Sequence, residues 1–284
     1  MLFWLIAAPG LLHAQPKVAA TIKPAQLVAQ AITKGISEVA LVLDGNQDPH
    51  LLSLKPSQRR LLDEADVLVW IGPALEQGLE KVVAGTDTQG RAIIQWLELK
   101  EADLISLNNN TDPHLWLSSH NVLLLAEKLR VQLQELDPAN AENYNENFQV
   151  FSQQLLQLDQ WISSSFAQQP VYAYAVYHKA FAYFEKEAGL APVISVSESE
   201  EIQPGIKRLL QVRNALDDNQ AQCLLIDPGV NVSQLKNVLG DGALQYVEVD
   251  VLANDIALSP TAYIEFKKSI AEKFYQCVYE DIDP

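Results

Sequence analysis

The chain has 284 residues, of which 48% are apolar and 20% charged, which is enough apolar material for a packed core and too much for intrinsic disorder. A formal net charge of −16 argues against the basic surface that nucleic acid or an anionic membrane would require, and it makes a cation the natural ligand. The length predicts one large domain or two medium ones.

An uncharged apolar run, Leu2 to Leu12, lies near the start of the chain, and Ala14 precedes a suitable cleavage point. The run has the length of a signal-peptide core and is shorter than the ~20 residues of a transmembrane helix. We therefore expect residues 1–14 to be a signal peptide. Because no basic residue precedes the apolar run, the signal peptide is expected to be incomplete at its start. A buried N-terminal strand is the alternative. No cysteine lies near the cleavage point and no later stretch could span a membrane, so we expect a soluble, exported protein without a membrane anchor.

From Lys17 onward, short runs typical of β-strands alternate with helical patterns, which predicts α/β layers with mainly parallel sheets. In the first half, strands are expected at Lys17–Ile22, Val39–Leu43 and Val67–Ile71. Helices are expected from Pro24, from Pro56 and, after Pro73, through Leu79, and the polar segment 107–113 is expected to be a loop.

Two long helices are predicted between Ser118 and Phe166, with a break at Asp137-Pro138. The second, from Ala139 to about Phe166, contains no Gly or Pro and would be roughly 40 Å long, well above the length of an average helix. We interpret it as a rigid link between two lobes, whereas an ordinary helix inside one large domain is the alternative. The predicted division is a signal peptide at 1–14, an N-terminal lobe at 15–136, a linking helix at 137–166 and a C-terminal lobe at 167–284.

The second half repeats the α/β pattern, which predicts a second lobe of the same class. Strands are expected at Val171–Tyr177, Val193–Val196, Cys223–Ile226 and Tyr246–Val249. Helices are expected around Ala180 to Phe184 with a stop at Gly189, at Pro204–Leu216, and at Pro260–Val278.

The two cysteines, Cys223 and Cys277, fit an oxidising compartment, which permits a disulfide between them. Closing a loop of that length could contribute roughly 4 kcal/mol on the chain-entropy estimate. Two unpaired buried thiols are the alternative. Neither cysteine has a neighbouring Cys or His at metal-binding spacing, so a zinc site built on them is not expected.

Three histidines share one placement, at the point where a loop or strand end meets a helix. His50 and His114 each follow an Asp-Pro dipeptide, and His178 follows the strand Val171–Tyr177. Ligands of open α/β sheets bind at the carboxyl ends of strands, so these imidazoles are expected to converge there. Imidazole suits zinc, copper, iron or nickel. The pattern therefore predicts a metal site, with a capping or packing role for each histidine as the alternative.

Other polar residues are assigned by their position in the predicted elements. Asp250 ends the strand Tyr246–Val249 and is expected to point into the same crevice, whereas Asp227 ends the preceding strand and is expected to form a turn. His120 lies inside a helix and is expected to face solvent or pack. The sequence has no nucleophile elbow, no phosphate-binding loop, no dinucleotide fingerprint and no HExxH zinc motif.

Four motifs between Lys17 and Cys277 resemble the solute-binding proteins of ABC transporters for transition metals, and they most resemble the zinc-uptake (ZnuA-type) members of that family. They are Asp48-Pro49-His50 with Leu54-Lys55-Pro56-Ser57, His114 to Ser118, Tyr177 to Phe184 followed by Gly189-Leu190, and Glu201 to Gly205.

This resemblance implies a periplasmic protein that captures Zn²⁺ as transported cargo and delivers it to the membrane permease of an ABC transporter, and that is not an enzyme. It implies a cleft site between the lobes, with ligands His50 and His114 from the N-terminal lobe, His178 from the C-terminal lobe, and Asp250 or water as the fourth. It also implies a Cys223–Cys277 disulfide. We expect a monomer.

Two departures from the family pattern are visible. Only residues 108–112 stand where many zinc members carry a His-rich loop, and Ala253 to Asp255 lack the Gly that usually follows the Asp250 motif. Alternatives remain: a manganese- or iron-binding member of the same family, a three-histidine metallohydrolase, or a metal-containing adhesin. Manganese prefers sites rich in oxygen ligands, which favours zinc here.

Overall fold

The computed structural model describes residues 15–44, 47–50, 54–87, 91–107, 110–167, 171–197, 204–240 and 244–279. The predicted signal peptide at 1–14 lies outside the described residues. So do the acidic tail from residue 280 and residues 201–203 of the fourth motif.

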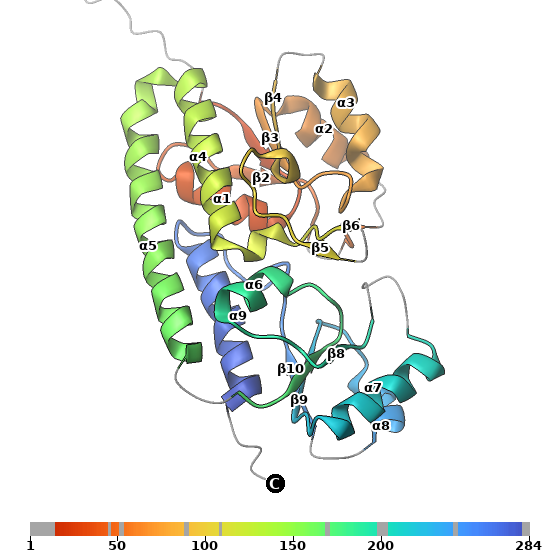
Figure 1. Ribbon diagram of the computed structural model, residues 1–284. Coiled ribbons are helices and arrows are strands. Elements are labelled where there is room, and N and C mark those ends of the chain that lie inside the picture. Colours follow the sequence, from red (N-terminus) through yellow and green to blue (C-terminus); the bar gives the residue numbers. More distant parts are fainter. Residues whose placement is uncertain are drawn as a thin grey trace, which may run out of the picture.

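The N-terminal half is built on a parallel sheet with the strand order β2-β1-β3-β4 (Figure 1). Its strands are β1 Val18–Ala20, β2 Val39–Leu41, β3 Val67–Trp70 and β4 Ala92–Gln95. β3 is buried at every position, as expected for a strand that is covered on both faces. The helices of this half are α1 Lys23–Ile32, α2 Pro56–Glu64 and α3 Glu80–Asp87, with short 3₁₀ turns at Gln77–Leu79 and Trp96–Glu98.

The C-terminal half contains a second parallel sheet, with the order β10-β9-β7-β8. Its strands are β7 Tyr174–Val176, β8 Ile194–Ser195, β9 Cys223–Ile226 and β10 Gln245–Glu248. Its helices are α6 Ala182–Ala188, α7 Ile206–Asp218, α8 Val232–Leu239 and α9 Ala262–Tyr279. α6 ends at Gly189, whose φ of 70° lies in the left-handed region that glycine adopts without strain.

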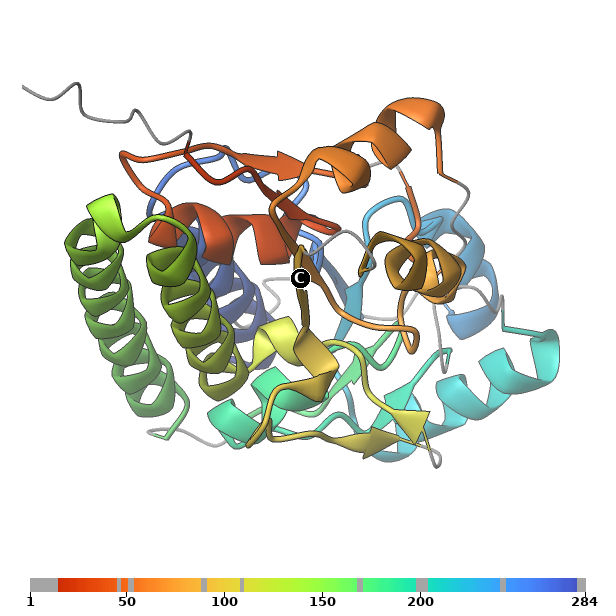
Figure 2. The ribbon, with the colours of Figure 1, turned by 90° about the horizontal axis from the view of Figure 1, so that it is seen from above.

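Two long helices lie between the two halves of the sequence, and the second connects the halves, as predicted. α4 (Ser119–Leu136) is followed by a 3₁₀ turn at Pro138–Asn140 and by the 27-residue α5 (Ala141–Ala167). α4 and α5 lie side by side (Figure 2), and α5 runs along both halves, contacting α1, α6 and α9. This arrangement confirms two α/β lobes joined by one long helix. α9 is a second connection, because it contacts α1 as well as β9 and β10.

The two lobes share one hydrophobic core. A continuous cluster of buried side chains extends from Val69 in the N-terminal sheet, through Trp116 and Phe151, to Phe274 on α9 and Cys223 in the C-terminal sheet. A smaller cluster lies where the C-terminal sheet meets α7 and α8. Because the larger core crosses between the lobes, a large rotation of one lobe against the other would expose apolar surface.

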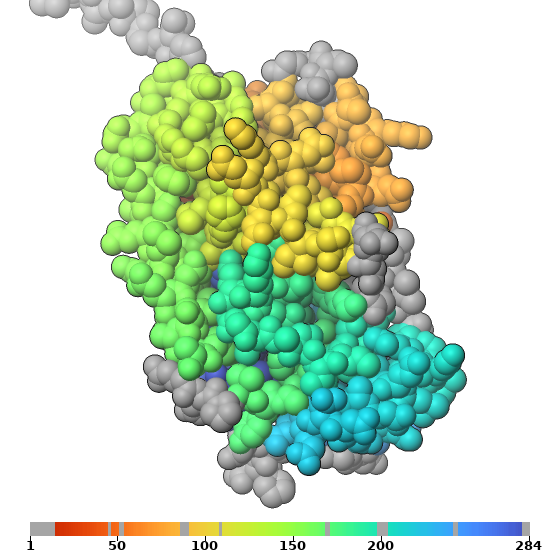
Figure 3. All heavy atoms as spheres, viewed as in Figure 1, coloured from red at the N-terminus to blue at the C-terminus, as the bar shows by residue number. Residues whose placement is uncertain are grey.

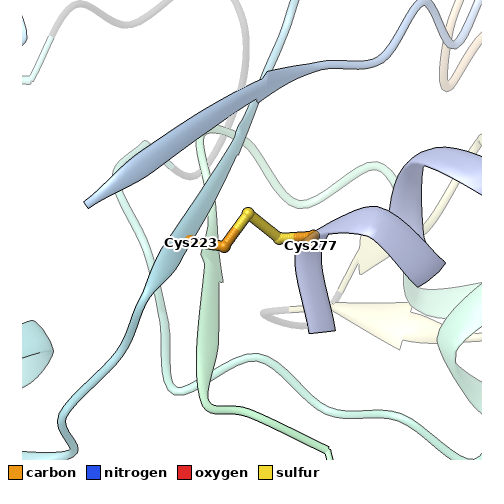
Figure 4. Close-up of a disulfide and its surroundings, with 2 residues drawn as sticks. All are labelled: Cys223 and Cys277. Carbon is orange, nitrogen blue, oxygen red and sulfur yellow. A yellow bond between two sulfur atoms is a disulfide. The ribbon is translucent and has the colours of Figure 1, made fainter. Parts of the chain in front are cut away.

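A disulfide joins Cys223, at the start of β9, to Cys277 near the end of α9 (Figure 4). The two Cα atoms are 5.4 Å apart, within the usual range for a disulfide, and both residues are buried. The disulfide expected from the family resemblance is therefore confirmed. It fixes α9 to the C-terminal sheet.

Some elements differ from the sequence-based expectations. The strand β4 and the helix α8 were not expected; α8 is capped by Asn231, whose side chain accepts from the Gln234 N–H at 3.0 Å. The segment 107–113, expected to be a loop, contributes to a two-stranded antiparallel ribbon, β5 Ser106–Leu107 with β6 Asn110–Thr111.

The helix expected to run through Leu79 begins later than predicted. Residues 72–76 form a tight turn, because the Glu76 carboxylate accepts from the Ile71 N–H at 2.8 Å and the Gly72 N–H at 3.3 Å. The Glu76 N–H also donates to the Gly72 carbonyl at 2.9 Å. These bonds hold the chain in a turn, and helical structure starts only at Gln77.

Candidate metal-binding site

The structure brings the three predicted histidines together. His50 lies in the connection after β2, His114 immediately precedes the 3₁₀ turn Leu115–Leu117, and His178 follows β7. The ring centroids of His114 and His178 are 5.5 Å apart, and those of His50 and His114 are 6.5 Å apart. The His114 ring therefore neighbours both of the other imidazoles.

The repeated Asp-Pro-His sequence folds in the same way at both places. The His50 N–H donates to Asp48 Oδ1 at 2.9 Å, and the His114 N–H donates to Asp112 Oδ1 at 3.0 Å. An aspartate that accepts from the backbone two residues on forms an Asx turn, and the proline between them fixes φ. The motif thus sets the backbone direction from which each imidazole projects.

Two of the imidazoles are oriented by buried carboxylates. His114 Nδ1 lies 2.7 Å from Asp112 Oδ1, and His178 Nδ1 lies 2.6 Å from Asp227 Oδ2. Because an ionised carboxylate can only accept, each Nδ1 carries the hydrogen, and each Nε2 is then the basic nitrogen. This carboxylate–histidine pairing is the arrangement by which proteins fix the tautomer of a metal-ligating histidine.

Asp227 has a larger role than the turn expected from the sequence. Its carbonyl does accept from the Val230 N–H at 3.2 Å, but its side chain binds His178. The reason is the sheet order: β7 and β9 are parallel neighbours with Val176 opposite Leu225, so the residues that follow the two strands meet. Sequence reasoning lacked this order and therefore missed the pair.

The two orienting carboxylates are incompletely satisfied. Asp112 is 1% exposed and Asp227 8% exposed, and among the described residues neither Asp112 Oδ2 nor Asp227 Oδ1 has a hydrogen-bond partner. A buried carboxylate with an unpaired oxygen is costly. A cation bound to the adjoining imidazoles would offset this cost, so the surroundings of the histidines are suited to positive charge.

Asp250 lies near the residues that surround the histidines, but its carboxylate accepts hydrogen bonds from its own loop. With Asp48, Tyr177 and Asp227, it lines a cavity of about 930 Å³. Its Oδ1 accepts from the Leu252 N–H at 2.9 Å, and its Oδ2 accepts from the Asn254 N–H. Burial raises the pKa of Asp250 above its ordinary value, against the lowering effect of these bonds.

His120 lies apart from this arrangement, as the sequence predicts. It is an exposed residue in the first turn of α4, and its Nε2 lies 3.0 Å from the Glu101 carbonyl oxygen.

Residues 18–277 match the family model described as zinc-uptake complex component A, periplasmic. The chain belongs to this zinc-uptake family. It is 28% identical over 291 residues to the high-affinity zinc uptake system protein ZnuA of Haemophilus ducreyi, covering 93% of this chain and 94% of that protein. It is 26% identical over 311 residues to ZnuA of Yersinia pestis, covering 97% and 98% of the two chains.

The fold of this zinc-uptake family member is also that of a solved structure, described as a crystal structure of ZnuA. The TM-score is 0.80 at 24% identity, with 93% of this chain and 99% of that chain covered. Among the residues that the structure describes, no helix has both the length and the apolar character needed to cross a membrane.

The ring positions can be tested against zinc, the ion named in the family description. Two imidazoles that bind one tetrahedral zinc through nitrogens at about 2.0–2.1 Å have centroids about 5 Å apart. The His114–His178 separation of 5.5 Å is close to this value, whereas the His50–His114 separation of 6.5 Å is wider. Accordingly, no group of three or more His, Cys, Asp or Glu residues in the described part of the chain is already arranged to hold a metal.

Proposed function

We propose that this member of the zinc-uptake family captures zinc in the periplasm and delivers it to the membrane permease of an ABC transporter. The family assignment supports the transport role. The zinc-uptake proteins to which the chain is similar support zinc as the cargo. The ion is substrate rather than cofactor, so the site has to release it without chemistry, and we propose no enzymatic activity.

The proposed ligands are His50, His114 and His178, with a fourth position taken by water or Asp250. The observation that carries this assignment is the pair of buried carboxylates, Asp112 and Asp227, each bonded to the Nδ1 of one histidine. A histidine held in this way presents Nε2 as the ligand. Water is the better fourth candidate, because both oxygens of Asp250 accept from its own loop.

This ligand set favours zinc over manganese or iron. The three proposed protein ligands are imidazole nitrogens, which suit zinc, whereas manganese is bound best by carboxylate and carbonyl oxygens. A dominant carboxylate ligand would reverse this preference, so the metal preference also tests whether Asp250 stays outside the coordination shell.

Other parts of the assignment remain predictions. They are the signal peptide at residues 1–14, the division into lobes at 15–136 and 167–284 with a linking helix at 137–166, the monomeric state, and the lack of a membrane anchor.

Comparison of His114→Ala with His120→Ala tests the ligand assignment. Each variant loses one imidazole near the start of α4, but only His114 lies in the histidine group. Calorimetric zinc titration should show at least a tenfold weaker affinity for His114→Ala, which is about 1.4 kcal/mol or more. His120→Ala should bind zinc as the parent protein does. A larger loss from His120→Ala would contradict the assignment.

The competing functions predict different behaviour. Zinc-dependent hydrolysis of ester substrates would favour a metallohydrolase, because three histidines with one open position also form a catalytic zinc site. Binding to a protein partner that survives complete removal of metal would favour an adhesin. We expect neither result.

A further inference from the structure

We propose that His114 and His178 form a preassembled two-histidine half-site that binds the ion first, and that His50 joins afterwards. Tyr183 and Tyr263 are positioning residues that attach the His114 segment to the C-terminal lobe. This proposal rests on the proposed function and adds to it the order in which the site is filled.

The first attachment reaches the residue that orients His114. Tyr183, on α6, is 1% exposed. Its hydroxyl donates to the Asp112 carbonyl oxygen at 2.9 Å and accepts from the Ile105 N–H at 3.1 Å. Asp112 in turn bonds to both the backbone and the ring of His114. A side chain of the C-terminal lobe therefore holds the turn from which the His114 ring projects.

The second attachment follows two residues after His114. The Trp116 indole N–H donates to the Val251 carbonyl oxygen at 2.8 Å, and the Tyr263 hydroxyl donates to the Trp116 carbonyl oxygen at 2.7 Å. Val251 follows β10, and Tyr263 lies on α9, the helix that the disulfide fixes to β9. Both aromatic side chains are buried, so these bonds are shielded from water.

The third attachment is a partly buried ionic group at the start of α4. The Ser119 N–H donates to Glu187 Oε1 at 2.6 Å, while Lys267 on α9 contacts Glu187 Oε2 at 2.6 Å and the Ser119 hydroxyl. Lys267 is 1% exposed while the Glu187 side chain is 28% exposed, and removal of Glu187 would leave a buried ammonium group with Asp159 at 3.3 Å as its remaining carboxylate partner. On the surface, Lys186 of α6 also pairs with Asp103.

Figure 3 shows the same attachment from outside: the yellow segment that precedes α4 lies directly against the green-to-teal segment that contains α6. In the sequence, His114 lies within the predicted N-terminal lobe. In the structure, however, the side-chain contacts described above attach residues 112–119 to α6, α9 and the end of β10. His114 therefore moves with His178, which follows β7 of the same lobe.

His50 is carried by a different part of the molecule. It follows β2, an edge strand of the N-terminal sheet. The ring distances agree with this division, because the His114–His178 pair at 5.5 Å is close to zinc-binding geometry while His50 is 6.5 Å from His114. When His50 approaches an ion already held by the other two rings, it completes the site. When His50 withdraws, the ion loses one ligand and can be released.

The test compares zinc affinities by competition with a chromophoric chelator. We expect His50→Ala to retain zinc binding and His114→Ala to lose at least tenfold more affinity than His50→Ala. In the His50→Ala background, Tyr183→Phe should weaken zinc binding further, by about tenfold. In the His114→Ala background, Tyr183→Phe should have no effect, because the ring that it positions is gone.

Tyr144→Phe is the matched control. Tyr144 is also fully buried, at 0% exposed, and its hydroxyl donates to Asp137 Oδ2 at 3.1 Å, at the turn between α4 and α5. It should leave zinc affinity unchanged in both backgrounds. If Tyr183→Phe does not fold, Tyr263→Phe, which removes the bond to the Trp116 carbonyl, carries the same comparison.

Three outcomes would overturn the proposal: equal losses from His50→Ala and His114→Ala, a Tyr183→Phe effect on melting temperature without one on zinc affinity, or the same affinity loss from Tyr144→Phe. Failure of the parent protein to bind zinc would instead refute the proposed function, so the two failures are distinguishable.

Discussion

Replacement of Asp227 by asparagine tests how strongly the site depends on a carboxylate that is outside the proposed ligand set. Asp227 Oδ2 lies 2.6 Å from His178 Nδ1, and the residue is 8% exposed. Asparagine keeps the size and an acceptor oxygen, but it removes the negative charge that raises the basicity of His178 Nε2. Loss of such a partner typically weakens metal binding 10- to 100-fold, which is about 1.4–2.7 kcal/mol. Because the bond is short and buried, we expect the upper half of that range.

The assay is a calorimetric zinc titration with Asp255→Asn as the matched control. Asp255 lines the same cavity from an exposed position, so its replacement changes the net charge equally without touching the His178 pair. We expect Asp255→Asn to shift zinc affinity less than threefold. Equal losses from the two variants would mean that overall charge decides the affinity. An unchanged affinity in Asp227→Asn would mean that His178 is not a ligand oriented by this carboxylate.

Three further predictions concern pH, the disulfide and a buried acid. Zinc affinity should be lower at pH 5.5 than at pH 7.5, because imidazole, with an ordinary pKa of about 6.5, must be neutral to bind; equal affinities would exclude a three-histidine site. Native protein should contain no reactive thiol, and reduction of Cys223–Cys277 should lower the melting temperature while zinc binding is largely kept; two titratable thiols would contradict this. Burial raises the pKa of Glu76 to about 7, because the buried carboxyl is more stable when it is protonated and neutral. The stability that the protonated carboxyl contributes is fully present below pH 4.5 and is lost as the pH rises through 7. Between pH 5 and pH 8, the free energy of unfolding of Glu76→Gln should therefore rise by about 2–3 kcal/mol relative to that of the parent, as measured by urea unfolding. A difference that does not change with pH would refute burial as the cause.

Much of the fold could be predicted because local signals and tertiary structure agree. Pro56 stands in the first turn of α2, Gly189 ends α6, and the break at Asp137-Pro138 separates α4 from α5. The apolar run Cys223–Ile226 coincides with β9, which is buried at every position. Strands of this kind are recognisable because both faces are covered, so the whole run is apolar.

Two of the elements that were missed, β4 and the β5–β6 ribbon, carry weak local signals. β4 is an edge strand in which three of four residues are only half-buried, so its run of apolar residues is short. The β5–β6 ribbon consists of two-residue strands within a polar segment, which resembles a loop in sequence. α8 could have been found, because Asn231 is a good helix-capping residue followed by apolar positions at helical spacing.

The grouping of the three histidines was predictable from the sequence, whereas only one of their two carboxylate partners was. Asp112 could have been recognised from the sequence, because an aspartate two residues before His114 forms an Asx turn. Asp227 could not, because its contact with His178 depends on β7 and β9 being neighbours in the sheet. The attachment of residues 112–119 to the C-terminal lobe likewise comes from tertiary contacts between distant segments, such as Tyr263 with Trp116.

The most direct test of the account is metal analysis by mass spectrometry of protein purified without a histidine tag, after exposure to zinc, manganese and iron together. We predict zinc bound in a one-to-one ratio to the chain, reduced in His114→Ala and retained in His120→Ala. Manganese or iron in place of zinc, or the same zinc content in both variants, would contradict the account.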